Sequence, residues 1–197
     1  MKSLNTRPKL ILASTSVYRA RALRQLNVDF SPIDPELPET LVAHENAADR
    51  AIRLATAKAQ AVLSDHLDAV VIGSDQVGVC QAQILGKPGS KSAAIEQLLF
   101  CRNHKATFFT AVAIYSKRRS LVKCISSELV FRDLSRAQIE RYLDIEEAWD
   151  CAGSFKIESL GIALFTEVRS TDPSALIGLP LIATTSMLAE FGFSPFD

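Results

Sequence analysis

The N-terminal half of the chain alternates between short apolar runs and longer periodic ones. KLILAS, residues 9–14, is a short apolar run typical of a buried strand, and the stretch at about 17–27 has the spacing of a helix. Apolar residues recur at i, i+3 and i+4 over roughly 44–64, which predicts a long helix. DAVVIGSD, 68–75, is a continuous apolar run that ends in polar residues, so we expect a central strand there.

The rest of the chain continues with both kinds of element. We expect strands at 76–85, 106–116, 121–131 and 161–168, and helices at about 91–101, 135–145 and 180–191. The basic turn KRRS lies between two β-rich stretches and predicts a hairpin. SPIDPELPET, 31–40, holds three prolines and three acids, so we expect a loop or an irregular edge. The pattern favours an α/β or mixed α+β fold, with a mixed twisted sheet flanked by helices.

The bulk composition is that of one globular domain spanning 1–197. The chain is 48% hydrophobic and 22% charged, and its 22 basic and 22 acidic residues leave no global field to attract nucleic acid. No apolar run approaches the ~18 residues that span a bilayer, and the N-terminus has no signal-like apolar core. We therefore expect a cytoplasmic protein with neither a nucleic-acid nor a membrane partner.

The cysteines and histidines do not suggest a metal site. Cys80, Cys101, Cys124 and Cys151 lie far apart and form no close pair of the kind that zinc sites use. We expect free thiols in a reducing compartment. The three histidines show no ligand spacing either.

Hydroxyl groups and an arginine lie together at the first strand-to-helix junction. Ser14 and Ser16 precede the helix, where hydroxyls and free backbone amides form an anion site. Arg19 falls in the first turn, where the partial positive charge of the helix end makes a cation mildly unfavourable. A bound phosphate would reverse that effect, because the guanidinium fork matches phosphate oxygens. The alternative is a serine cap beside an arginine directed to water. Walker-type and GxGxxG glycine loops are absent.

Two lysines are further candidates for phosphate contacts. Lys58 lies on the apolar stripe of its helix, so it either extends past the core edge or points into a cleft. Lys87, in LGKPG, lies at a rigid turn just before a helix, where it is either solvated or a fixed phosphate contact.

Asp75 is the strongest catalytic candidate. It follows AVVIGS, so we expect a strand to end there, and ligand sites in α/β proteins gather at the carboxyl ends of strands. Such a carboxylate can hold Mg²⁺ or accept a proton from an attacking water. The alternative is a turn cap. Glu36 and Glu39, in the proline-rich segment, are candidates for a second acid, and the alternative is a plain acidic loop.

Six motifs together resemble the Maf family of nucleoside triphosphate pyrophosphatases. They are LILASTSVYR, the Lys58 helix, IGSDQV, GKP, CAGSFKIE and DPSALIGLPLIA, and they extend from about residue 9 to 191. The resemblance implies cleavage between the α and β phosphates of a nucleoside triphosphate with a divalent metal, Mg²⁺ or Mn²⁺. It also implies two lobes with a cleft between them, an inosine-triphosphatase-like architecture, and a homodimer as one assembly to expect.

The resemblance assigns roles to particular positions. Asp75 matches the proton-accepting acid of the family. The remaining matches are the phosphate-binding residues Ser14, Ser16, Arg19, Lys58 and Lys87, and the metal-binding residues Asp75 and Glu39. Three departures concern phosphate affinity and metal geometry: Val17 replaces a helix-opening proline, Ala20 replaces a second arginine, and Pro38 stands where an acid is common.

Within the family, SDQV with CAGSFKIE resembles the branch that acts on 7-methyl-GTP. By the same comparison Tyr18, Gln76 and Glu158 fall on positions that set base choice. Methylation at N7 makes guanine cationic, so an aromatic face such as Tyr18 and a carboxylate such as Glu158 would favour it. The alternatives are a packing tyrosine and a solvated acid. Alternative functions are a pyrophosphatase for dTTP, UTP or another modified nucleotide, and a non-catalytic nucleotide sensor that regulates cell division.

Overall fold

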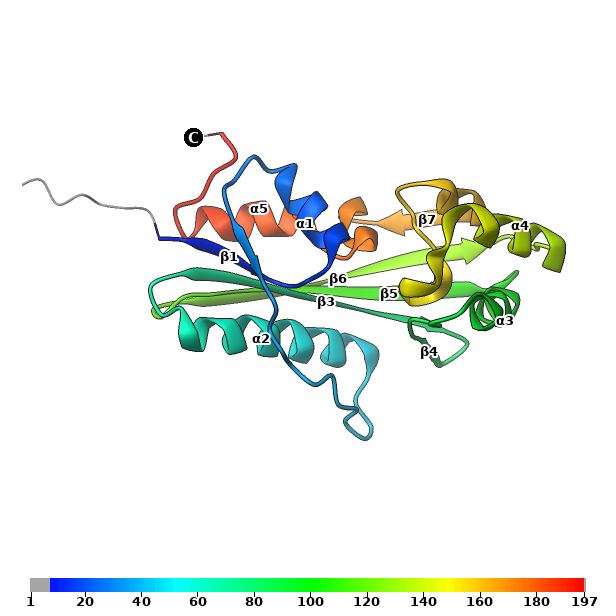
Figure 1. Ribbon diagram of the computed structural model, residues 1–197, viewed down its shortest axis with the longest axis horizontal. Coiled ribbons are helices and arrows are strands. Elements are labelled where there is room, and N and C mark those ends of the chain that lie inside the picture. Colours follow the sequence, from blue (N-terminus) through cyan, green and yellow to red (C-terminus); the bar gives the residue numbers. More distant parts are fainter. Residues whose placement is uncertain (1–7, 197) are drawn as a thin grey trace, which may run out of the picture.

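A seven-stranded mixed sheet forms the centre of the computed structural model, which describes residues 8–196 (Figure 1). The strands are β1 (Leu10–Ala13), β2 (Ser31–Ile33), β3 (Val70–Cys80), β4 (Gln83–Leu85), β5 (Lys105–Tyr115), β6 (Ser120–Phe131) and β7 (Phe165–Ser170). Their order is β2-β1-β3-β5-β6-β7, with β4 paired to β3. β1 runs parallel to β2 and β3, and the other pairs are antiparallel.

Helices cover both faces of this sheet. They are α1 (Val17–Arg24), α2 (Ala47–Asp65), α3 (Lys91–Cys101), α4 (Arg136–Glu146) and α5 (Leu181–Ala189). Short 3₁₀ turns lie at Ala148–Asp150, Ala152–Ser154, Leu160–Leu164 and Pro173–Ile177. Figure 1 shows α1 and α5 on one face and α2 on the other. The prediction of a mixed α/β fold is confirmed. None of the helices within 8–196 is long and apolar enough to cross a bilayer.

Two details of the predicted elements were wrong. The separate strands expected at 68–75 and 76–85 are largely one strand, β3, which pairs with β5 from Val71 to Cys80. Polar Ser74 does not end this strand because its hydroxyl donates to backbone carbonyls inside the fold. The strand expected near 161–168 begins only at Phe165, after a 3₁₀ turn. The segment 31–40 does supply an edge, since its first residues form β2.

Close packing of α2 on β3 depends on Gly73. A Cβ atom at this position would lie 2.1 Å from the carbonyl oxygen of Ala55 and 2.7 Å from the backbone nitrogen of Ala59. Small residues of α2 form a buried cluster against the sheet at this contact. The helix therefore approaches the strand closely enough to bring Lys58 toward the sheet.

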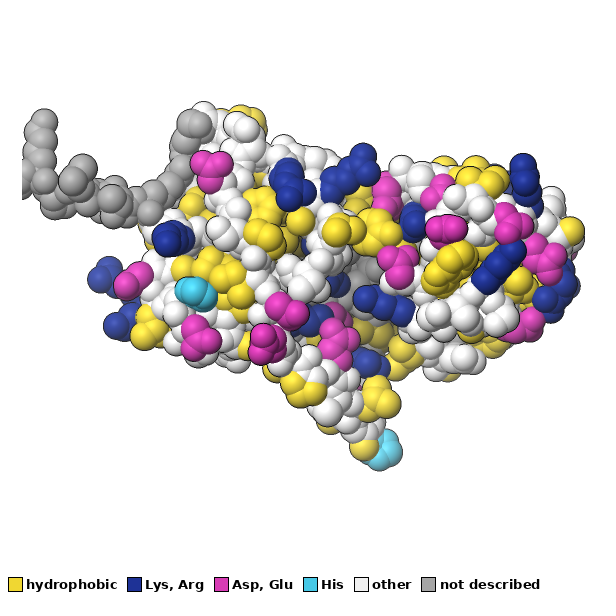
Figure 2. Space-filling view, viewed as in Figure 1, with side chains coloured by type: hydrophobic (Ala, Val, Ile, Leu, Met, Phe, Trp, Pro, Cys, Tyr) yellow, Lys and Arg dark blue, Asp and Glu magenta, His cyan; other side chains and the backbone are white. Residues whose placement is uncertain are grey.

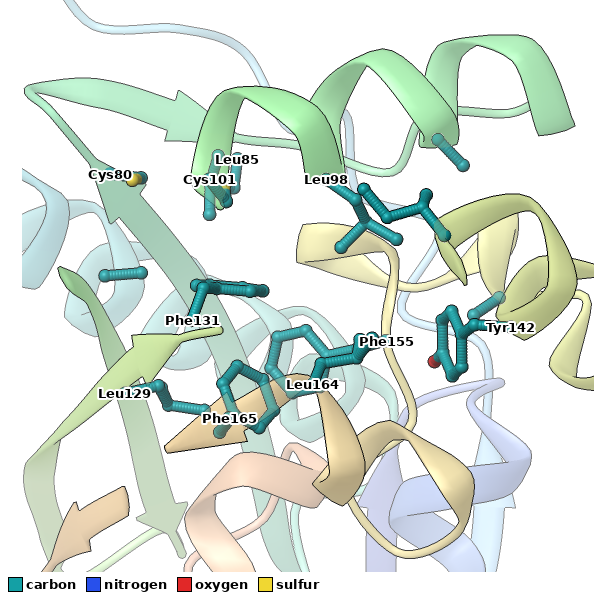
Figure 3. Close-up of a cluster of buried hydrophobic side chains, with 14 of the residues drawn as sticks. Cys80, Leu85, Leu98, Cys101, Leu129, Phe131, Tyr142, Phe155, Leu164 and Phe165 are labelled. Atoms are coloured by element: carbon teal, nitrogen blue, oxygen red, sulfur yellow. The ribbon is translucent and has the colours of Figure 1, made fainter. Parts of the chain in front are cut away.

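A second core lies at the far end of the long strands, under α3 and α4. Its centre is a group of aromatic rings that meet edge to face: Phe108, Phe131, Phe155 and Phe165. Figure 3 shows the last three of these rings. Strands β3, β5 and β6 contribute residues both to this core and to those around β1. The chain thus has two lobes that share one sheet, as expected.

The sheet has a gap between these lobes. β5 follows one edge of β3, so β1 and β4 share the other edge. β1 pairs only with Val70–Ile72, and β4 only with Gly78–Cys80. The stretch between, Gly73–Val77, has no strand on that edge among the described residues. Asp75 is in the middle of this stretch.

Candidate active site

A cavity of about 710 Å³ opens at this gap. All ten predicted site residues line it: Ser14, Ser16, Tyr18, Arg19, Glu39, Lys58, Asp75, Gln76, Lys87 and Glu158. Figure 2 shows a hollow with acidic and basic side chains at its rim. Glu36, the alternative second acid, is not among its described lining residues. The structure therefore brings together segments from β1 to residue 158, although the roles of these residues remain predictions.

Asp75 and Glu39 share the ammonium group of Lys58. The Lys58 Nζ atom donates to Asp75 Oδ1 at 2.6 Å and to Glu39 Oε1 at 2.6 Å. Lys58 is buried and points into the cavity, not past the core edge. The second carboxylate oxygen of Asp75 accepts no hydrogen bond from any described residue, so it is available to a ligand or a water.

The expected position of Asp75 at a strand end was wrong. The residue lies within β3, opposite Ala111 of β5. It faces a cavity because the neighbouring strand β1 ends, while β3 itself continues. The side chain alternates with those of Ser74 and Gln76, and therefore points to the α2 face of the sheet.

Arg19 approaches Asp75 from the opposite face. Its Nε atom donates to the carbonyl oxygen of Gly178 at 2.9 Å, and Nη2 lies 4.0 Å from Asp75 Oδ1. Burial lowers the pKa of Arg19, and the charges of Asp75 and Glu39 oppose that effect. Arg19 is thus a fixed cation whose side chain is only 16% exposed, and the alternative of an arginine directed to water does not hold.

The serines ahead of α1 organise its first turn. Ser16 caps the helix, because its hydroxyl oxygen accepts the backbone N–H of Arg19 at 3.3 Å. Ser14 is buried, and its hydroxyl oxygen accepts the backbone N–H of Ser16 at 3.1 Å. Its Oγ atom is also 3.5 Å from Nη1 of Arg19. The cap that we considered as an alternative is therefore present, and it coexists with the arginine in the cavity.

The pKa of Glu39 is lowered by its basic neighbours. Burial by itself raises it, but the hydrogen bond and charge of Lys58 outweigh burial, with smaller contributions from Arg19 and Lys87. Glu39 is therefore ionised at neutral pH. It supplies a second carboxylate beside Asp75.

Tyr18 and Gln76 both line the cavity and are both held by hydrogen bonds. The Tyr18 hydroxyl donates to Asp150 at 3.4 Å, and burial together with nearby Cys151 and Asp150 raises the pKa of Tyr18. The amide nitrogen of Gln76 donates to Thr110 Oγ1 at 3.0 Å and to the backbone carbonyl oxygen of Ala175 at 2.9 Å. That carbonyl is only an acceptor, so the amide orientation is determined and the Gln76 oxygen is left without a described donor.

Four charged lining residues were not predicted: Asp34, Arg50, Asp150 and Lys156. A signal for one of them exists in the sequence. Arg50, Leu54 and Lys58 follow one another at intervals of four, which places them on one helix face. Within the described residues, five basic and five acidic side chains line the cavity, so its formal charge balances.

A divalent metal fits the two carboxylates only as part of a larger ligand set. No cluster of three or more acidic, histidine or cysteine side chains suitable for a metal occurs within 8–196. Mg²⁺, however, is usually held by one or two carboxylates together with waters and substrate phosphates. Asp75 and Glu39, whose oxygens converge on one ammonium, can supply those two carboxylates.

The family model and the relatives similar in sequence both indicate the Maf family. The family model described as Maf-like protein matches residues 9–191. A protein of Cupriavidus metallidurans named 7-methyl-GTP pyrophosphatase is 44% identical over 196 residues, 98% of each chain. One of the same name from Xanthomonas axonopodis pv. citri is 47% identical over 186 residues, 94% of this chain and 98% of its own. The solved structure of the Staphylococcus aureus Ham1 protein covers 64% of this chain and 72% of its own at 17% identity and a TM-score of 0.45, which is too low for an inference.

Proposed function

The chain belongs to the Maf family, and we propose that it is a nucleoside triphosphate pyrophosphatase that hydrolyses 7-methyl-GTP to 7-methyl-GMP and pyrophosphate. It would thereby remove a modified nucleotide from the pool. The names of relatives that share nearly the whole chain support this substrate. The observation that carries the proposal is the position of Asp75, which lies between the buried Lys58 and the largely buried Arg19 and has one carboxylate oxygen that no residue within 8–196 engages.

The phosphates would be bound by cations from both faces of the sheet. Ser14, Ser16 and Arg19 approach from α1, and Lys58 and Lys87 approach from the α2 side and the turn after β4. Because Ser14, Ser16, Arg19 and Lys58 are held by protein contacts before substrate arrives, they can stabilise charge that develops on the leaving pyrophosphate without reorganising. Of these, Arg19 and Lys58 are held closest to Asp75.

Asp75 would act as the general base. Its free oxygen takes a proton from a water molecule as the water oxygen attacks the α phosphorus. The bridging P–O bond breaks, and the bonding electrons leave with pyrophosphate. Lys58 holds the other Asp75 oxygen and so keeps the carboxylate oriented toward the cavity.

We propose Mg²⁺ or Mn²⁺ as the cofactor, held by Asp75 and Glu39. A cavity with balanced formal charge would gain several negative charges on binding a triphosphate. A divalent cation bound there would neutralise part of that charge and polarise a phosphoryl oxygen. Cytoplasmic location and a homodimeric assembly stay predictions.

The base would lie against Tyr18, with Glu158 and Gln76 at its edge. A cationic 7-methylguanine is favoured by an aromatic face and by a carboxylate. The unengaged oxygen of Gln76 could accept a hydrogen bond from the donor edge of guanine. Glu158 is exposed at the cavity, where it can reach a ligand without breaking a protein contact.

Pyrophosphate release by Asp75→Asn tests the proposal. The assay uses 7-methyl-GTP, GTP, dTTP and UTP with Mg²⁺ or Mn²⁺. Loss of the base should lower kcat on 7-methyl-GTP by about 10²–10⁴-fold. The fold should persist, because Glu39 still pairs with Lys58. Asp29→Asn, at an exposed position outside the cavity, is the matched control.

Each outcome has a definite meaning. Full turnover by Asp75→Asn would remove Asp75 from the chemistry. A wild type that binds nucleotide without releasing pyrophosphate would instead indicate a sensor. A preference for dTTP or UTP would overturn the assignment of the base.

A further inference from the structure

Three of the five basic side chains that line the cavity already have hydrogen-bond partners among the described residues, and two have none. Arg19 donates to a backbone carbonyl, Lys58 to two carboxylates, and Lys156 to the carbonyl of Glu146. The side chains of Arg50 and Lys87 make no hydrogen bond or ion pair with any described residue. These two are therefore the cations that an incoming anion can engage without displacing a protein partner.

Arg50 lies in an unfavourable position while no anion is bound. Its Nε atom is buried and has no hydrogen-bond partner within 8–196. An unpaired buried donor costs free energy, and a cation within the first four residues of a helix is also disfavoured by the helix dipole. A bound anion would relieve both costs at once.

The neighbouring arginine shows that the local chain can satisfy such a group. Arg53 donates to both carboxylate oxygens of Glu45, at 2.6 and 2.7 Å, and to the carbonyl oxygen of Thr40 at 3.2 Å. Arg53 does not line the cavity within the described chain. Within 8–196, the side chain of the arginine that faces the cavity thus has no hydrogen bond or ion pair, whereas the arginine that faces the loop is paired. The pKa of Glu45 is lowered mainly by its hydrogen bond with Arg53, and the charge of Arg50 adds a smaller effect.

Helix geometry puts Arg50 on the same stripe as Lys58. Arg50, Leu54 and Lys58 recur at intervals of four, and all three line the cavity. This stripe faces Asp75 from the side of the sheet opposite Tyr18 and α1. A substrate whose base lies at Tyr18 and whose α phosphate lies at Asp75 would extend its remaining phosphates toward α2.

We propose that Arg50, with Lys87, binds the β and γ phosphates of the substrate and hence the pyrophosphate product. The identity of the substrate rests on the proposed function, but the need of Arg50 for an anionic partner does not. The guanidinium can offer two parallel N–H donors to neighbouring phosphate oxygens.

The test compares the Arg50→Gln, Arg50→Lys and Arg141→Gln variants. Arg141 is exposed on α4 outside the cavity, so its variant removes the same charge at a position that does not contact the proposed ligand. Calorimetry measures the affinity for inorganic pyrophosphate and for 7-methyl-GMP. We expect Arg50→Gln to weaken pyrophosphate binding about ten- to a hundredfold, because the loss of hydrogen bonds to a charged group changes the affinity by about this factor. Binding of 7-methyl-GMP should be unchanged, and Arg50→Lys should recover part of the loss.

Folding stability distinguishes a ligand contact from a structural role. If Arg50 serves anion binding, Arg50→Gln without ligand should unfold at the same or a higher urea concentration than wild type, because a buried unpaired N–H is removed. Equal pyrophosphate affinity in Arg50→Gln and wild type would overturn the proposal, as would equal losses for pyrophosphate and 7-methyl-GMP. Pyrophosphate binding is measured without turnover, so this result stands apart from the catalytic test of Asp75.

Discussion

The Lys58 ammonium lies 2.6 Å from a carboxylate oxygen of Asp75, and each of the two side chains is only 8% exposed. α2 contributes the lysine and β3 the acid, and the close approach at Gly73 holds the two elements together. Buried ion pairs contribute little net stability, but the loss of one partner is costly. This pair therefore keeps a charged, oriented carboxylate at the centre of the cavity.

Lys58→Met should destabilise the protein and abolish turnover. The change leaves the Asp75 and Glu39 carboxylates without their shared cation, and removing one partner of a buried pair costs about 3–5 kcal/mol. Urea unfolding measures the free energy. Lys91→Met is the control, because it breaks an exposed pair with Asp144 and should cost less than about 1 kcal/mol. If Lys58→Met were as stable as this control, the ion pair of Lys58 with Asp75 would not contribute to the stability of the fold.

Gly73→Ala should loosen the contact between α2 and β3. Its methyl group would meet the backbone of Ala55 and Ala59, which cannot move aside as a flexible side chain could. We expect a loss of about 1–3 kcal/mol or more in the free energy of unfolding. Gly86→Ala is the control, since a Cβ there has no atom within 4 Å. Equal stability of the two variants would show that α2 tolerates a shift.

Glu39 should stabilise the fold at neutral pH and cease to do so in acid. Its pKa in the folded state is lower than in the unfolded chain, so its contribution is present above the ordinary value of 4.5 and is lost as the pH falls through the lowered value. Urea unfolding of wild type and Glu39→Gln between pH 3 and 7 measures this. The stability difference should be greatest above about pH 5 and should shrink in acid. A difference that does not change with pH would contradict the ion pair with Lys58.

Glu158→Gln should reduce the preference for the methylated base. The substitution removes the negative charge but keeps the size, so 7-methyl-GTP should lose more than GTP does. The measurement is the ratio of kcat/KM for the two nucleotides, which should fall by about three- to tenfold. Glu147→Gln, exposed and outside the cavity, is the control. An unchanged ratio would place base selection elsewhere, with Asp150 beside Tyr18 as the next residue to test.

Asp75 shows where sequence reasoning succeeds and where it stops. The polar end of AVVIGSD predicts an acid that emerges from an apolar strand, and the structure places that acid in the cavity. The same pattern predicts a strand end, which was wrong, because pairing with β5 extends β3 to Cys80. The polar residues do not end the strand here, because the Ser74 hydroxyl donates to backbone carbonyls inside the fold and Asp75 pairs with Lys58.

The sequence itself predicted the mixed α/β fold, the first strand and the helix after it, and the ten candidate residues that line the cavity. These features depend on local spacing and on motifs read along the chain, so they need no knowledge of distant contacts. Only the tertiary structure decided that, among residues 8–196, β1 and β4 leave part of one edge of β3 open, and that Gly178 engages Arg19 while Arg50 keeps a buried donor with no partner in that part of the chain. The partner of a charged group is chosen by packing between segments far apart in the chain, and that packing follows from shape and burial of the whole fold.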